Sequence, residues 1–88
     1  MRVVIVLHSP HFERAFKKLP RSVRLEALTR EKWFRADCFD SRLKTHKLSG
    51  RLADAWAFSV TQKYRIPFRF ITDTEVVFDD IDDHDMYR

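Results

Sequence analysis

The chain has 88 residues, of which 44% are hydrophobic and 34% are charged, and its formal net charge is +4. This length suits a single domain spanning 1–88, and the hydrophobic fraction is too high for a disordered chain. The single cysteine, Cys38, excludes an internal disulfide and a zinc site of several thiolates, which is typical of a reducing compartment. The apolar run 3–7 is too short for a signal peptide or a membrane span, so we expect a cytoplasmic protein without membrane contact.

Positive charge is concentrated in the first part of the chain. Residues 1–51 hold 13 Lys and Arg against 5 Asp and Glu, whereas residues 52–88 hold 4 against 8. A basic region of this kind suits a polyanion such as RNA or DNA, or an acidic protein partner. A solvated surface that keeps the protein soluble explains the same charges equally well.

The first half of the chain predicts a strand followed by two helices. The β-branched run 2–7 predicts a strand covered on both faces and therefore central in a sheet. Ser9 and Pro10 are typical of an N-cap and first helical residue, and apolar residues at helical spacing follow up to Pro20. Ser22 is expected to cap a second helix that runs to about Arg35, which gives a helical hairpin.

The second half predicts antiparallel strands. Residues 36–53 predict a loop with room for a short strand at 45–48. From residue 56 the apolar period is two, with turns at 61–63 and 72–74 and a last strand at 75–81. Pro67 falls inside the middle strand, so either its N–H side is unpaired or the strand bulges there. The predicted fold class is α+β: an N-terminal strand, a helical hairpin and a three- to four-stranded antiparallel sheet.

Two arginines are predicted on the polar face of the sheet. The period of two places Arg65 and Arg69 opposite the apolar side chains of the same strand. Arginine can direct two donors at a phosphate, so both residues are candidates for RNA binding. The alternative is a solvated arginine that pairs with a nearby acid.

His84 is the candidate for proton transfer because histidine titrates near neutral pH. It lies between carboxylates, in the sequence Asp82-Asp83-His84-Asp85. One alternative is a surface histidine in an acidic tail. A metal site built from these four residues is the other, but adjacent residues in an extended tail alternate sides, which argues against it.

A basic loop precedes the only glycine. Lys44, His46, Lys47 and Arg51 could hold RNA phosphates, although such a run is more often just solvated. Tyr87 could stack on a base or only pack the terminus. No glycine-rich phosphate loop, zinc signature or nucleotide-fold fingerprint is present, so we expect chemistry without a cofactor or metal.

Four short stretches together resemble a known protein family. They are 43–52 (LKTHKLSGRL), 56–60 (WAFSV), 64–68 (YRIPF) and 81–87 (IDDHDMY). In combination and order they resemble the RelE/ParE superfamily of toxin–antitoxin toxins, and most nearly the RelE, YoeB and YafQ-like mRNA interferase branch. The resemblance spans essentially the whole chain and implies a RelE-like fold.

The resemblance implies a toxin of a type II toxin–antitoxin system, of the kind also linked to plasmid stabilization. Such a toxin cuts mRNA on the ribosome without metal and is neutralised by a cognate antitoxin, and it contacts DNA only through the toxin–antitoxin complex. The implied catalytic residues are His84, Arg65, Tyr87 and His46, and the implied RNA contacts include Lys44, Lys47 and Arg51.

The implied reaction is attack of a 2′-hydroxyl on the adjacent phosphate. His84 would protonate the leaving 5′-oxygen or act as base, and Arg65 would stabilise charge on the transition state. Two alternatives stay open: a ParE-like inhibitor of DNA gyrase without RNase activity, and a degenerate toxin that only binds its antitoxin.

Overall fold

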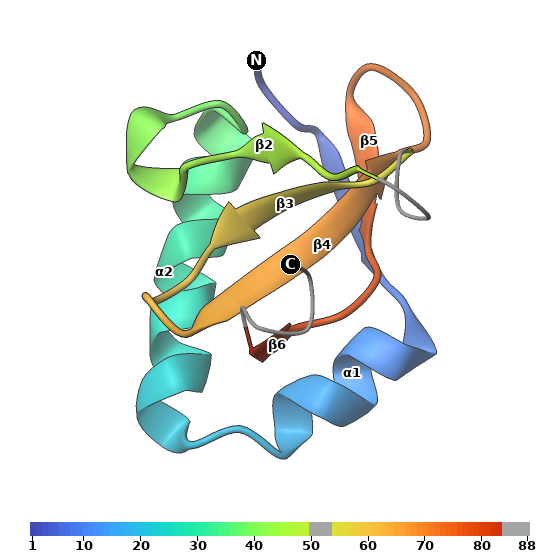
Figure 1. Cartoon of the computed structure of the whole chain (residues 1–88). Helices are drawn as coiled ribbons and strands as arrows, with labels where there is room; N and C mark the ends of the chain where they lie inside the picture. The colour runs from blue at the N-terminus through green and yellow to red at the C-terminus, as the bar shows by residue number, and fades with distance from the viewer. Residues whose placement is uncertain (50–53, 84–88) are drawn as a thin grey trace.

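A computed structural model describes residues 1–49 and 54–83 of the chain (Figure 1). The structure confirms the predicted α+β class. Its elements, in chain order, are β1 (Ile5–His8), α1 (Pro10–Lys17), α2 (Arg21–Ala36), the short 3₁₀ helix η1 (Ser41–Leu43), β2 (His46–Lys47), β3 (Trp56–Ser59), β4 (Tyr64–Phe70), β5 (Glu75–Phe78) and β6 (Asp82–Asp83). None of the helices in this described part is long and apolar enough to cross a membrane.

The described strands form one sheet with β4 at its centre. The order is β1-β5-β4-β3-β2, and β6 pairs with the opposite end of β4 from β5. All neighbours are antiparallel except β1 and β5, which are parallel. The sheet is therefore larger than predicted, because β6, which the sequence did not predict, pairs with β4. The predicted last strand 75–81 ends at Phe78.

The prediction that the first strand is central was wrong. β1 lies at the edge of the sheet, and Val4, Ile5 and Leu7 remain 60%, 42% and 50% exposed. Within the run 3–7, only Val3, which is buried, and Val6, which packs against the cluster, reach the core. Here a continuous β-branched run indicates extended backbone, but it does not indicate that both faces of the strand are buried.

The two helices begin at different kinds of cap. Ser9 caps α1 as predicted: its Oγ accepts a hydrogen bond of 3.0 Å from the N–H of Phe12, and Pro10 is the first helical residue. The prediction that Ser22 caps the second helix was wrong. Pro20 is the N-cap residue of α2, and its carbonyl accepts from the N–H groups of Val23 and Arg24. No side chain caps that end.

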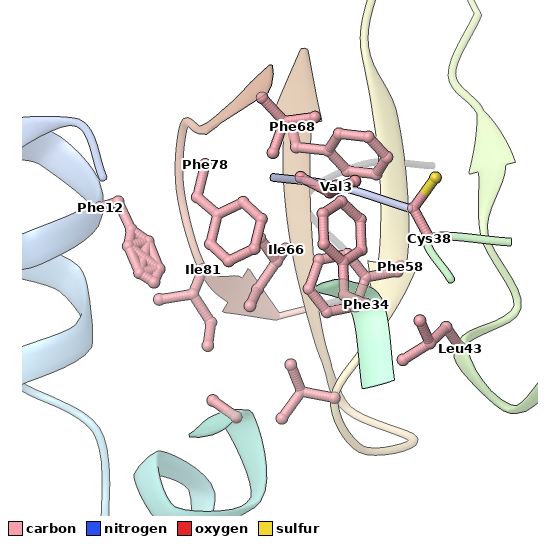
Figure 2. Close-up of a cluster of buried hydrophobic side chains, with 13 residues drawn as sticks. Val3, Phe12, Phe34, Cys38, Leu43, Phe58, Ile66, Phe68, Phe78 and Ile81 are labelled. Carbon is pink, nitrogen blue, oxygen red and sulfur yellow. The ribbon is translucent and has the colours of Figure 1, made fainter. Parts of the chain in front are cut away.

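Aromatic side chains fill the space between α2 and the sheet (Figure 2). Phe34 of α2 is fully buried, and its ring centroid lies 4.7 Å from that of Phe58, 4.8 Å from Phe68 and 5.3 Å from Phe78. Phe12 of α1 extends this cluster to the first helix through its contact with Phe78. The side chains of β3 and β4 that alternate with these aromatic residues lie on the face of the sheet away from α2.

Pro67 sits where the ladder on one side of β4 is interrupted. β4 pairs with β5 from Phe68 onward and with β6 only at Tyr64 and Arg65. The carbonyl of Pro67 accepts from the N–H of Asp79, so the side of Pro67 that lacks an N–H faces the connection between β5 and β6. Of the two predicted alternatives, the structure shows the first: the missing N–H of Pro67 lies on the side where β4 has no ladder partner, while its other side pairs with Ala57.

Candidate functional site

Two of the predicted catalytic residues contact each other across β3. His46 pairs with Ala57 in the β2–β3 ladder, and Arg65 pairs with Ser59 in the β3–β4 ladder, so both side chains lie on the face away from α2. The Nη1 atom of Arg65 lies 3.2 Å from Nε2 of His46. The sheet register therefore brings together residues that are 19 positions apart in the sequence.

The second ring nitrogen of His46 fixes the tautomer. Nδ1 lies 3.0 Å from the carbonyl oxygen of Lys44, and a carbonyl can only accept, so Nδ1 carries the proton. Nε2 is then an acceptor for the Arg65 guanidinium, which can only donate. In this arrangement the imidazole is neutral, and the lone pair of Nε2 is occupied by the hydrogen bond from Arg65. Nε2 can accept a proton from a substrate hydroxyl only once the Arg65 guanidinium has moved away from this lone pair.

The turn before β2 determines where the ring of His46 lies. Lys44 ends η1 in the left-handed region, with φ of 52°, and its N–H bonds to the carbonyl of Ser41 at 3.3 Å. This turn directs the carbonyl of Lys44 at the imidazole two residues later. A non-glycine residue in this conformation carries a small energetic cost, which the surrounding contacts must offset.

A basic hollow adjoins the Arg65–His46 pair. Its volume is about 250 Å³, and it lies between the β3–β4 turn, α2 and η1. It is lined by Arg30, Arg42, Lys44, Ser59, Val60, Thr61, Gln62 and Arg65. Four of these are cations and none is acidic. Predicted residues Lys44 and Arg65 meet here, whereas Arg30, Arg42 and the turn residues were not predicted.

Arg69 has a different environment from Arg65. Its Nε and Nη2 atoms each lie 2.8 Å from an oxygen of Asp79, which raises the pKa of Arg69 through this bidentate hydrogen bond. Arg69 does not line the basic hollow. The contact of Arg69 with RNA stays a prediction. In the structure Arg69 pairs with an acid, Asp79, which was the alternative to RNA binding.

The acidic residues near the end of the described chain have basic neighbours. Asp79 binds Arg69, Asp80 lies 3.2 Å from Nε2 of His11, and Asp83 lies 3.9 Å from Nζ of Lys63. The contacts with Arg69 and Lys63 offset charge that would otherwise repel a polyanion. Lys47 lies on β2 opposite Trp56, on the face of the strand away from His46.

Three predicted residues lie outside the described part of the chain: Arg51, His84 and Tyr87. The residue before His84 is described. Asp83 pairs with Tyr64 in the β4–β6 ladder, next to the pair of Asp82 with Arg65. The described part of the chain thus ends with Asp82 opposite Arg65 and Asp83 opposite Tyr64. Among residues 1–49 and 54–83, no group of three His, Cys, Asp or Glu side chains could hold a metal ion.

Cys38 belongs to the core. It is fully buried among the hydrophobic cluster, and burial raises the pKa of its thiol. A thiol in this environment is a poor nucleophile because the reactive form is the thiolate. The position of Cys38 agrees with the absence of a nucleophile pattern around it in the sequence.

The sequence matches no protein-family model, and no curated protein matches it significantly. Solved structures do match. A YoeB/ParE toxin from Agrobacterium tumefaciens aligns with a TM-score of 0.76 at 12% identity, over 92% of this chain and 99% of that one. The RelE–RelB complex from Pyrococcus horikoshii gives 0.73 at 15% identity, over 94% and 96%. The RelBE2 toxin–antitoxin complex from Mycobacterium tuberculosis gives 0.71 at 22% identity, over 96% and 94%. The chain therefore has the fold of the RelE and YoeB/ParE toxins over nearly its whole length.

Proposed function

We propose that this protein is the toxin of a type II toxin–antitoxin system and that it cleaves mRNA bound to the ribosome. The observation that carries this proposal is the contact between Arg65 and the neutral imidazole of His46 beside a basic hollow. The fold supports it, because solved structures with this fold include toxins in complex with antitoxins. The resemblance of the sequence to the mRNA interferase branch supports it independently.

The proposed reaction is a transesterification within RNA. The 2′-oxygen forms a bond to the adjacent phosphorus, and the bond from phosphorus to the 5′-oxygen of the next nucleotide breaks. Arg65 would stabilise the negative charge that grows on the phosphoryl oxygens, because its guanidinium lies beside His46, the proposed base.

Two protons move in this reaction. Nε2 of His46 would accept the proton of the 2′-hydroxyl after the Arg65 guanidinium turns from this atom to the phosphate, since the carbonyl of Lys44 keeps the other proton on Nδ1. His84 would donate a proton to the departing 5′-oxygen. Its support is the resemblance, together with the pairing of Asp83 beside the strand position of Arg65. Tyr87 would contact the substrate from the same terminal segment.

The proposed partners follow from the positive charge of the hollow and of residues 1–51. Lys44 and the other cations of the hollow would contact RNA phosphates on the ribosome. A cognate antitoxin, encoded beside the toxin, would neutralise the protein in the cytoplasm. The excess of basic residues in 1–51 suits both an RNA and an acidic partner protein.

The test is to induce the protein in growing cells and to follow growth and transcript integrity. We expect growth arrest with cleaved mRNA. Arg65→Gln should lower cleavage by translating ribosomes in vitro by roughly 10²–10³-fold, because one charge-stabilising group is lost. His84→Ala should lower it by roughly 10²–10⁴-fold, because proton donation is lost. Arg35→Gln serves as the control, since Arg35 pairs with Glu31 and does not line the hollow.

The outcomes separate the alternatives. Circular dichroism shows whether the Arg65→Gln protein is folded. If it is folded and as toxic as the wild type, the catalytic role assigned to Arg65 is wrong. Intact transcripts with double-strand DNA breaks would favour the ParE-like gyrase inhibitor. If transcripts and DNA both stay intact while the protein binds its antitoxin tightly, the protein is a toxin that only binds its antitoxin.

A further inference from the structure

Two arginines of the basic hollow are held in place by one tryptophan. The Cζ atom of Arg42 lies 3.8 Å from the ring centroid of Trp33, and that of Arg30 lies 4.8 Å from it. Contacts of this kind between guanidinium groups and an indole are attractive. α2 contributes both Trp33 and Arg30, while η1 contributes Arg42.

Hydrogen bonds fix both guanidinium groups further. Arg30 donates from Nε to Glu26 at 3.2 Å and from Nη1 to the carbonyl of Arg42 at 3.0 Å. Arg42 donates from Nε and Nη2 to Asp40 at 3.0 and 2.7 Å. The two side chains have therefore already lost much of the rotamer freedom that a ligand would otherwise have to restrict.

The hollow keeps an excess of positive charge after these pairs are formed. Four cations line it, whereas Glu26 and Asp40 bind two of them from outside the lining. Nη2 of Arg30 makes no hydrogen bond to any residue in 1–49 or 54–83. The β3–β4 turn adds uncharged donors and acceptors from Ser59, Thr61 and the exposed Gln62. A purely structural role for Arg30 and Arg42 would not require Lys44 and Arg65 to face the same space.

We infer that this hollow is a second phosphate-binding subsite, formed by Arg30, Arg42 and the turn residue Gln62. It holds the sugar–phosphate backbone of single-stranded RNA next to the phosphate that Arg65 contacts. This inference rests on the proposed function for the identity of the strand as RNA. The volume of about 250 Å³ is smaller than the ~300–1,000 Å³ of typical small-molecule pockets, which suits a phosphate with part of its sugar. Because Arg65 lines the same hollow, one strand can occupy both positions.

The experiment measures binding separately from cleavage. The probe is a short single-stranded RNA whose 2′-hydroxyls are methylated, so it binds but cannot react. Fluorescence anisotropy over a range of salt concentrations gives the affinity and its salt dependence. Arg30→Gln should weaken binding about tenfold and reduce the slope of log affinity against log salt by about 0.7, as expected for one phosphate contact with a single strand. Arg35→Gln is the matched control, because it removes the same charge and the same kind of i,i+4 pair from the same helix.

A second pair of variants does not depend on Arg30. Gln62 is exposed in a turn, so neither substitution there disturbs the core. Gln62→Lys should tighten binding and Gln62→Glu should weaken it, each by several-fold, because the added charge lies at the hollow. Circular dichroism checks that the variants stay folded.

The outcomes distinguish this inference from the proposed function. Equal effects of Arg30→Gln and Arg35→Gln, together with equal affinities of the two Gln62 variants, would overturn the subsite even if the protein cleaves mRNA. Weaker binding by Arg30→Gln alone would support the subsite even if unmodified RNA is never cleaved, in which case the proposed function fails and the RNA-binding site remains.

Discussion

The ionisation of Asp40 makes the stability of the fold depend on pH. Its side chain accepts from the backbone N–H of Arg42 at 2.9 Å and from the Arg42 guanidinium, and these bonds lower the pKa of Asp40 from 3.8 to about 2. A carboxyl group with a lower pKa in the folded state stabilises the fold above its unfolded pKa. That contribution is lost as the pH falls from about 3.8 through about 2.

We therefore predict a pH-dependent effect of Asp40→Asn. The difference in free energy of unfolding between wild type and variant should be constant above about pH 5 and should shrink as the pH falls toward 2, because protonation makes the two side chains alike. Urea unfolding at a series of pH values measures it. A difference that stays the same at pH 2.5 and pH 7 would show that Asp40 is not held ionised by Arg42.

The sequence could predict the face on which a residue lies but not its partner. The period of two placed Arg65 and Arg69 on one face of β4, which the structure confirms. Their different partners, His46 and Asp79, come from other elements and depend on strand register. Nothing in the sequence pattern marked Arg30 and Arg42 either, since their meeting at Trp33 depends on how η1 returns to α2.

Among the elements, β4 has two distinct kinds of backbone position on the side that faces β5 and β6. At Pro67 the ladder is interrupted, whereas Arg69 is paired with Val77 within the β4–β5 ladder. Proline removes a backbone donor, so its cost should depend on which kind of position it occupies.

This contrast gives a prediction for two positions of one strand. Pro67→Val should change the free energy of unfolding by less than about 1 kcal/mol, mainly through the unfolded chain. Arg69→Pro should cost about 1–3 kcal/mol more than Arg69→Ala, because it leaves a ladder carbonyl of β5 without its donor. Chemical denaturation of the four proteins tests this. Similar stabilities of the Arg69→Pro and Arg69→Ala proteins would mean that the ladder is not intact there.

The elements themselves were largely predictable, and their places in the sheet were less so. Helix spacing and the Ser9 cap located α1, and alternation located β3 and β4. The position of β1 at the edge and the existence of β6 depend on long-range pairing, which a local pattern does not contain. The same reason explains why a β-branched run suggested a central strand.

At the scale of the whole molecule, Phe34 joins the helical layer to the sheet. Its ring contacts one aromatic residue on each of β3, β4 and β5. A domain of this size has a total stability of roughly 5–15 kcal/mol. Loss of a fully buried phenylalanine typically costs about 3–5 kcal/mol.

Phe34→Ala should therefore remove a large part of the stability, by about 3–5 kcal/mol. Phe39→Ala is the control, because Phe39 is 42% exposed and its ring lies 5.5 Å from that of Trp56, which is itself only partly buried. It should cost no more than about 1 kcal/mol. Thermal and urea unfolding measure both variants. Equal losses would show that stability does not depend on the junction at Phe34.

The pairing of β1 with β5 also has a consequence for synthesis. Each residue of β1 pairs with a residue seventy positions later, as Ile5 does with Glu75. Contacts between such distant segments form slowly, because the intervening chain must first be ordered. On a translating ribosome β1 must wait until β5 has emerged before it can pair. Until then its apolar edge is available to a chaperone or partner.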